Sequence, residues 1–113
     1  MVKSFEDLII WQDARKLANL VHFTFIDLKD FEFRNQINSA ATSIMNNIAE
    51  GFERYSKAEF KRFLQIAKAS NAEVRSMTYL AVDYNYTTGE KANEIRNLSI
   101  KIKSEIVNLM NTL

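Results

Sequence analysis

The sequence predicts an all-α protein that folds as a single domain, an antiparallel, up-down-up-down four-helix bundle. Its 113 residues include no proline and only two glycines, which favours long helices over a β architecture with many turns. Apolar residues also recur at three- and four-residue steps, which is the helical period. Helices of this length with short connections pack most economically in antiparallel order. We place the helices at about residues 6–28, 33–50, 57–85 and 90–112 of the domain 1–113.

Composition narrows the class of protein. Fifteen basic and fourteen acidic residues give a net charge of +1, so the overall charge points to no particular partner. The absence of cysteine excludes a disulfide framework, a thiolate nucleophile and a cysteine-based zinc site. The first residues lack the apolar core of a signal peptide, and no apolar run approaches the ~20 residues needed to cross a bilayer. We therefore expect a cytoplasmic protein with no membrane partner.

The first predicted helix carries more apolar residues than one core-facing stripe needs. Ser4 is its predicted N-cap, with Glu6 and Asp7 in the first turn. The stripe consists of Leu8, Trp11, Ala14, Ala18, Val21, Phe25 and Leu28. The surplus indicates a second contact surface and hence self-association, although a wider core is the alternative. Including two apolar residues off the stripe of the last helix, the candidate oligomer interface is Ile10, Leu17, Leu20, Phe23, Ile100 and Val107.

The second predicted helix combines an apolar stripe with many small polar side chains. Its inward positions are Ile37, Ala40, Ala41, Ile44, Ile48 and Ala49. The polar positions are Asn35, Gln36, Asn38, Ser39, Ser43, Asn46 and Asn47. Because Ser and Asn are mediocre helix formers, their density predicts close helix approach or paired, buried amides.

The stretch from Asn47 to Ser56 is the predicted corner between the second and third helices. Gly51 is expected just beyond the last helical turn, where a left-handed backbone favours glycine. Ser56 and Glu59 have the spacing of a capping box at the start of the third helix. The same spacing recurs at Thr87 and Glu90, before the fourth.

The last two predicted helices each present one core-facing stripe. In the third helix, Ser70 and Asn71 interrupt a stripe of Phe60, Phe63, Leu64, Ala67, Val74, Met77, Ala81 and Tyr84. The fourth helix has a nearly heptad pattern of Ala92, Ile95, Leu98, Ile102, Ile106, Leu109 and Leu113.

The sequence gives little support to an enzyme. His22 is the single histidine, and it has no carboxylate at metal-binding spacing. There is no Glu-x-x-His pair of the di-iron bundle type, no glycine-rich phosphate loop and no nucleophile with a recognisable base. We therefore predict no catalytic residues, no metal and no cofactor, and we expect His22 to be a structural or interface residue.

Two polar patterns remain as candidate sites. Ser43, Asn47, Glu50 and Arg54 share a helix face near the corner, where they form either a network that locks the two helical hairpins together or a binding site. A basic stripe is the second pattern, and its members are Arg54, Lys57, Lys61, Lys68 and Arg75. Arg96 and Lys103 make a similar pair on the fourth helix. Such a stripe either follows nucleic-acid phosphates or is a solvated helix face partly neutralised by Glu59, Glu73, Glu94 and Glu105.

Three segments carry a family resemblance. They read Phe5-x-x-Leu8-x-x-Trp11-Gln12-x-Ala14, then Gln36-x-x-x-Ala40-x-x-Ser43-Ile44-x-x-Asn47-Ile48-Ala49-Glu50-Gly51, then Arg54-x-Ser56-x-x-Glu59-Phe60-x-x-Phe63-Leu64-x-x-Ala67-x-x-Ser70-x-x-Glu73. The chain resembles the four-helix-bundle proteins encoded by intervening sequences in bacterial large-subunit ribosomal RNA genes. It departs from many members by Ala69 in place of glycine and by lacking a proline before the second helix. The residues of the motif that we expect to be structural are Gln36, Ser43, Asn47, Glu50, Gly51, Arg54, Ser56 and Glu73.

The resemblance implies a fold, an assembly and a choice of functions. It implies an up-down four-helix bundle that assembles as a ring-shaped homopentamer. A related branch, the accessory variability protein of diversity-generating retroelements, is a basic pentamer that binds nucleic acid and a reverse transcriptase. Our leading hypothesis is a non-enzymatic oligomer associated with ribosomal RNA intervening sequences. The alternatives are an RNA- or DNA-binding accessory protein, with a reverse transcriptase as its protein partner, and a protein–protein scaffold.

Overall fold

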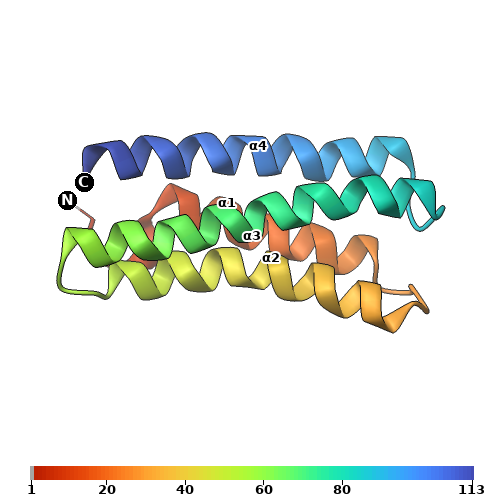
Figure 1. Ribbon diagram of the computed structural model, residues 1–113, viewed down its shortest axis with the longest axis horizontal. Coiled ribbons are helices and arrows are strands. Elements are labelled where there is room, and N and C mark those ends of the chain that lie inside the picture. The colour runs from red at the N-terminus through yellow and green to blue at the C-terminus, as the bar shows by residue number, and fades with distance from the viewer. Residues whose placement is uncertain (1) are drawn as a thin grey trace.

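The computed structural model describes residues 2–113 and confirms the all-α four-helix bundle (Figure 1). A short 3₁₀ helix, η1 (Phe5–Asp7), precedes the first long helix. The long helices are α1 (Ile9–Thr24), α2 (Phe31–Phe52), α3 (Lys57–Asp83) and α4 (Gly89–Thr112). The bundle measures 43 × 22 × 20 Å. None of these helices is long and apolar enough to span a membrane within the part of the chain described.

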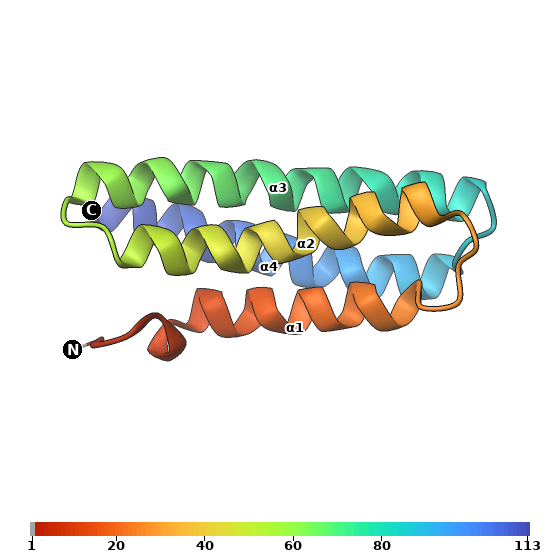
Figure 2. The same ribbon diagram turned by 90° about the horizontal axis from the view of Figure 1, so that it is seen from below.

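The helices form a four-cornered bundle. Helix α1 packs against α2 and α4, and α3 packs against the same two neighbours. The α1–α2 and α3–α4 turns lie at one end of the bundle, while both termini lie at the other end with the α2–α3 corner (Figures 1 and 2). The outer side formed by α1 and α2 is therefore opposite the outer side formed by α3 and α4.

The core corrects part of the predicted oligomer interface. Ile10 and Leu17 were expected on an outer surface, but they are 6% and 0% exposed and belong to the core. The reason is that α1 is covered by both α2 and α4, so its buried arc is wider than one stripe. Leu20 also packs against the core, whereas Phe23 and Ile100 remain 64% and 53% exposed.

The first predicted helix is interrupted near its start. Leu8 is extended (φ −74°, ψ 126°) and separates η1 from α1, so Ser4 caps no long helix. Instead, the Ser4 hydroxyl donates to the Asp7 carboxylate at 3.3 Å. The side chain of Gln12 donates to the Glu6 carbonyl at 2.9 Å, which holds η1 against the first turns of α1.

Gly51 lies inside α2 and not beyond its end, so the predicted left-handed backbone at this residue is wrong. A Cβ atom at this position would lie 2.7 Å from Cβ of Phe63 and 3.0 Å from Cδ1 of Phe60. The glycine is therefore required by the close approach of α2 and α3 and not by its own φ angle. The helix ends one residue later, at Phe52.

The left-handed residue is Asn85, at the end of α3 (φ 59°). The amide of Tyr86 donates to the Ala81 carbonyl at 2.7 Å, and that of Asn85 donates to the Val82 carbonyl at 3.0 Å. These two bonds form a Schellman C-cap, which asparagine tolerates better than most residues. Because α3 ends here, Tyr84 is 54% exposed and does not belong to the core stripe where it was predicted.

The sequence predicts the N-cap of α3 correctly but places the N-cap of α4 one residue too early. The Ser56 hydroxyl accepts from the Glu59 amide at 3.1 Å, as its spacing predicted. At the start of α4, the cap is Thr88, which accepts from the Lys91 amide at 3.1 Å. The predicted capping box at Thr87 is therefore wrong by one residue. The side chain of either threonine can cap a helix, so the path of the chain after the Schellman turn decides which of the two is the N-cap.

Candidate nucleic-acid interface

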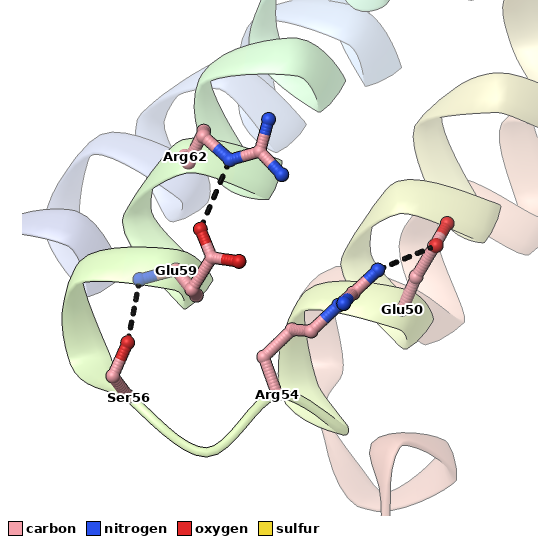
Figure 3. Close-up of polar contacts among 5 residues, drawn as sticks. All are labelled: Glu50, Arg54, Ser56, Glu59 and Arg62. Atoms are coloured by element: carbon pink, nitrogen blue, oxygen red, sulfur yellow. Dashed lines mark hydrogen bonds and ion pairs between the residues drawn. The ribbon is translucent and has the colours of Figure 1, made fainter.

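Arg54 is held at the α2–α3 corner by its own neighbours. Its guanidinium donates to the Glu50 carboxylate at 3.1 Å, and both side chains remain about half exposed (Figure 3). The same guanidinium lies over the Phe63 ring, 4.7 Å from its centroid. On the other side of the corner, Glu59 accepts from Arg62 at 3.0 Å and so does not complete the capping box (Figure 3). Arg54 therefore belongs to the corner and not to the stripe along α3.

The predicted structural network is divided into separate contacts between α2 and α3. The hydroxyl oxygens of Ser43 and Ser70 are 2.9 Å apart across the two helices. Asn47 donates to the carbonyl and the hydroxyl of Ser43, at 2.8 and 3.0 Å. Nearer the other end, Gln36 donates to the Glu73 carboxylate at 3.3 Å. Ser43 and Gln36 thus tie the two hairpins together, whereas the Glu50–Arg54 pair stays within the corner.

A second network, between α3 and α4, was not identified from the sequence. Asn71 is fully buried and donates to the Ser99 carbonyl at 2.9 Å, while the Ser99 hydroxyl donates to the Asn71 side-chain oxygen at 2.8 Å. The guanidinium of Arg75 donates to the Ser99 hydroxyl at 3.1 Å. The available signal was the position of Ser99, which lies four residues after Ile95 and three before Ile102 in the apolar stripe.

The remaining cations of α3 and α4 gather on one outer side of the bundle. Arg75 touches α4 through Ser99, and seven-residue steps place Lys68 and Lys61 on the same side of α3. On α4, Arg96 donates to Thr78 of α3 at 2.9 Å. We define the α3–α4 basic face by these residues and their helical neighbours, namely Lys57, Lys61, Lys68, Arg75, Arg96 and Lys103.

The carboxylates expected to neutralise this face are engaged elsewhere. Glu59 pairs with Arg62, Glu73 accepts from Gln36 of α2, and Glu94 pairs with Lys91. Glu105 lies on the side of α4 that packs against α1. Within residues 2–113, none of the six cations of the α3–α4 basic face forms an ion pair. The face therefore carries six cations that have no ion-pair partner among the described residues, in a chain that is nearly neutral.

The seam between α1 and α4 contains the strongest electrostatic perturbation. Asp13 is 3% exposed, and its carboxylate lies 3.3 Å from Nζ of Lys101 and 3.7 Å from Nζ of Lys16. Burial, together with the neighbouring Asp13 carboxyl group, raises the pKa of Glu105 to about 7. No group of three or more potential metal-ligating His, Asp or Glu residues occurs in the described part of the chain. His22 is exposed on α1, with its ring 5.0 Å from that of Phe23.

Comparisons with known proteins agree with the fold and name a family. A family model described as 23S rRNA-intervening sequence protein matches residues 6–108. The chain is also similar to the crystal structure of a protein with unknown function from the S23 ribosomal protein family of Bacteroides thetaiotaomicron. The two share 27% identity and a TM-score of 0.82, over 90% of this chain and 98% of the other. No curated protein matches the chain. Neither description names an enzymatic activity.

Proposed function

Because the chain belongs to the 23S rRNA-intervening sequence protein family, we propose that it is a non-enzymatic, homo-oligomeric protein whose α3–α4 basic face binds the phosphate backbone of nucleic acid. The observation that carries this proposal is the segregation of charge on α3 and α4. Six cations share one outer side, and the carboxylates midway along both helices engage other partners. A solvated helix face with interspersed charges would not produce this separation.

The geometry of the face favours phosphates over bases. Cations seven residues apart on α3 are about 10.5 Å apart along the helix axis. The rows on α3 and α4 are separated by roughly one interhelical distance, about 8–10 Å. Between the two rows, the exposed ring of Tyr79 is covered by the Arg96 guanidinium at 3.8 Å, whereas the exposed rings of Tyr55 and Tyr84 lie near the two ends of α3. Two rows of charge with a covered ring between them fit a nucleic-acid backbone.

Charge reversal on the face tests the proposal. We expect Lys61→Glu combined with Lys68→Glu to weaken binding of a short RNA duplex at least about tenfold at low salt. The slope of log affinity against log salt should fall by about 2, since two phosphate contacts are lost. Fluorescence anisotropy measures both quantities, and thermal melting should be unchanged because neither lysine is buried or ion-paired.

A matched variant distinguishes an effect of the α3–α4 basic face from an effect of net charge alone. Lys3→Glu combined with Lys29→Glu produces the same change in net charge at exposed positions outside the face, so it should weaken binding far less. Equal losses for the two double variants, or no binding of the wild-type protein at low salt, would remove the proposal.

Self-association is supported by exposed apolar side chains around the α1–α2 turn. Phe23 and Phe31 are 64% and 58% exposed, which is unusual for large apolar side chains so close together in sequence. A second copy of the chain would cover them, and the family resemblance implies a homopentamer. Native mass spectrometry at micromolar concentration should show this oligomer, and Phe23→Ser combined with Phe31→Ser should dissociate it. A monomeric wild-type protein would rule out the assembly while leaving the binding test intact.

A further inference from the structure

The outer side formed by α1 and α2, opposite the α3–α4 basic face, carries a shallow groove. Three adjoining hollows of about 330–370 Å³ make up this groove. The first hollow lies on α1 alone and shares Arg15 and Asn19 with the second. The second and third hollows lie between α1 and α2 and share His22 and Asn38. The two helices lie side by side in the bundle (Figure 2).

The lining of this α1–α2 groove combines amides with positive charge. Arg15, Lys16 and Arg34 supply cations, and no carboxylate lines any of the three hollows. Trp11 closes one end of the groove, with the Arg15 guanidinium 5.9 Å from its ring. At the other end, Arg34 donates to the Ile26 carbonyl at 3.2 Å, which leaves further guanidinium N–H groups for a ligand.

The amides of the groove present unused acceptors. Asn19 donates to the Arg15 carbonyl at 3.0 Å, and Asn38 donates to the Arg34 carbonyl at 2.8 Å, each within its own helix. Within residues 2–113, neither side-chain oxygen accepts a hydrogen bond. Asn35 is exposed and also lines the groove. Asparagine lowers helix stability at all three positions, and no contact between helices explains it there.

We propose that the α1–α2 groove binds a single-stranded segment of nucleic acid, at a site separate from the α3–α4 basic face. Phosphates would contact Arg15, Lys16 and Arg34, while base amino groups would donate to the oxygens of Asn19 and Asn38. A duplex pairs the Watson–Crick edges of its bases and stacks their faces, so fewer base amino groups are free for the groove to recognise. An acidic peptide would match the cations but would place carboxylates, which only accept hydrogen bonds, beside amide acceptors.

The single tryptophan makes the groove directly observable. We expect a short unstructured RNA to quench Trp11 fluorescence with saturable binding, because bases entering this end of the groove approach the indole ring. The slope of log affinity against log salt should be about −2, for three phosphate contacts of a single strand. The same RNA annealed into a duplex, and polyglutamate, should quench little.

Paired variants distinguish this site from the α3–α4 basic face. Arg15→Glu combined with Asn35→Asp changes two exposed side chains and should weaken single-strand binding about tenfold while sparing duplex binding. Lys91→Glu combined with Asn97→Asp changes net charge equally on α4, at exposed positions outside the groove and outside the α3–α4 basic face, and should spare single-strand binding. Absence of quenching by single-stranded RNA at low salt, equal losses in both variants, or equal quenching by polyglutamate would overturn the inference. None of these results depends on duplex binding at the other face.

Discussion

The less exposed contacts of the α2–α3 seam are made by small, neutral groups, whereas the α1–α4 seam places two carboxyl groups against each other. In the first seam, Gly51 lets α2 approach Phe63, and Ser43 meets Ser70 at 2.9 Å. In the second, Asp13 and Glu105 each leave a buried carboxyl oxygen without a hydrogen-bond partner in the described part of the chain. Lys16 and Lys101 compensate only from the surface, since their side chains are 71% and 60% exposed.

This difference shows two ways of joining antiparallel helices. Small neutral residues allow close packing whose stability does not depend on protonation. Burial beside another carboxyl group favours the protonated form of Glu105, so the stability of this seam depends on pH. We call the α2–α3 seam the steric seam and the α1–α4 seam the titratable seam. Substitutions in the steric seam should change stability equally at all pH values, whereas substitutions in the titratable seam should change how stability depends on pH.

The largest effect is expected for Gly51→Ala, in the steric seam. The new methyl group would meet the Phe63 side chain at 2.7 Å, so the helices must move apart at a cost of about 1–3 kcal/mol in the free energy of unfolding. The matched control is Gly89→Ala, because a Cβ atom at that position in α4 would meet no atom within 4 Å beyond its chain neighbours and its own helix backbone. Chemical denaturation measures both. Equal stability of the two variants would show that α2 and α3 do not pack closely at Gly51.

Glu105→Gln tests the titratable seam. The pKa of Glu105 is raised from 4.5 to about 7, so the folded state binds more protons than the unfolded state between these values. Wild-type stability should therefore be highest below about pH 4.5 with respect to this group, and should fall as pH rises towards 7. After allowance for partial exposure, we expect a loss of about 1 kcal/mol that the variant lacks. Thermal melting of both proteins across this pH range measures the difference. The same dependence of stability on pH in the wild-type protein and the variant would contradict the expectation.

Ser43→Ala removes one hydrogen bond from the steric seam. Ser70 loses its partner across the helices, and Asn47 keeps only its bond to the backbone carbonyl of residue 43. We expect a loss of about 1 kcal/mol that does not change with pH. Ser39→Ala, on an exposed position of the same helix, is the control and should change stability by less than about 0.5 kcal/mol. A pH-dependent effect at Ser43 would remove the distinction between the seams.

The smallest effect is expected at the corner beside the steric seam. Glu50→Ala breaks the ion pair with Arg54, but both side chains are about half exposed. Exposed pairs of this spacing contribute roughly 0.3–0.5 kcal/mol, so melting should hardly change and the change should decrease with added salt. A loss above about 1 kcal/mol would mean that the corner carries more of the α2–α3 seam than its exposure indicates.

The errors of the sequence-based predictions have a common cause. Periodicity identified the helices and most core positions, because these follow from which residues are apolar. It misassigned Ile10 and Leu17, since a sequence pattern does not show how many neighbours cover a helix. It gave Gly51 a backbone role because a lone glycine looks the same whether φ or packing requires it.

For the candidate sites too, the sequence predicted the spacing of residues along a helix but not their contacts with neighbouring helices. The seven-residue spacing of Lys61, Lys68 and Arg75 was visible in the sequence. Whether nearby carboxylates neutralise these cations was not visible there. The answer depends on the direction of the Glu73 and Glu105 side chains, which contacts with α2 and α1 set. The groove between α1 and α2 had no sequence signal beyond a surplus of asparagine, because its two walls come from different helices.

The sequence alone determined that this chain forms four amphipathic helices in an antiparallel bundle, and it contained the motif of the family. These properties are local or follow from short-range periodicity, so they need no knowledge of partners. Only the tertiary structure decided that α2 and α3 meet at Gly51, that Asp13 faces Glu105, and that six cations share one outer side. Each of these depends on the distance and rotation between helices far apart in the chain, which are set by packing.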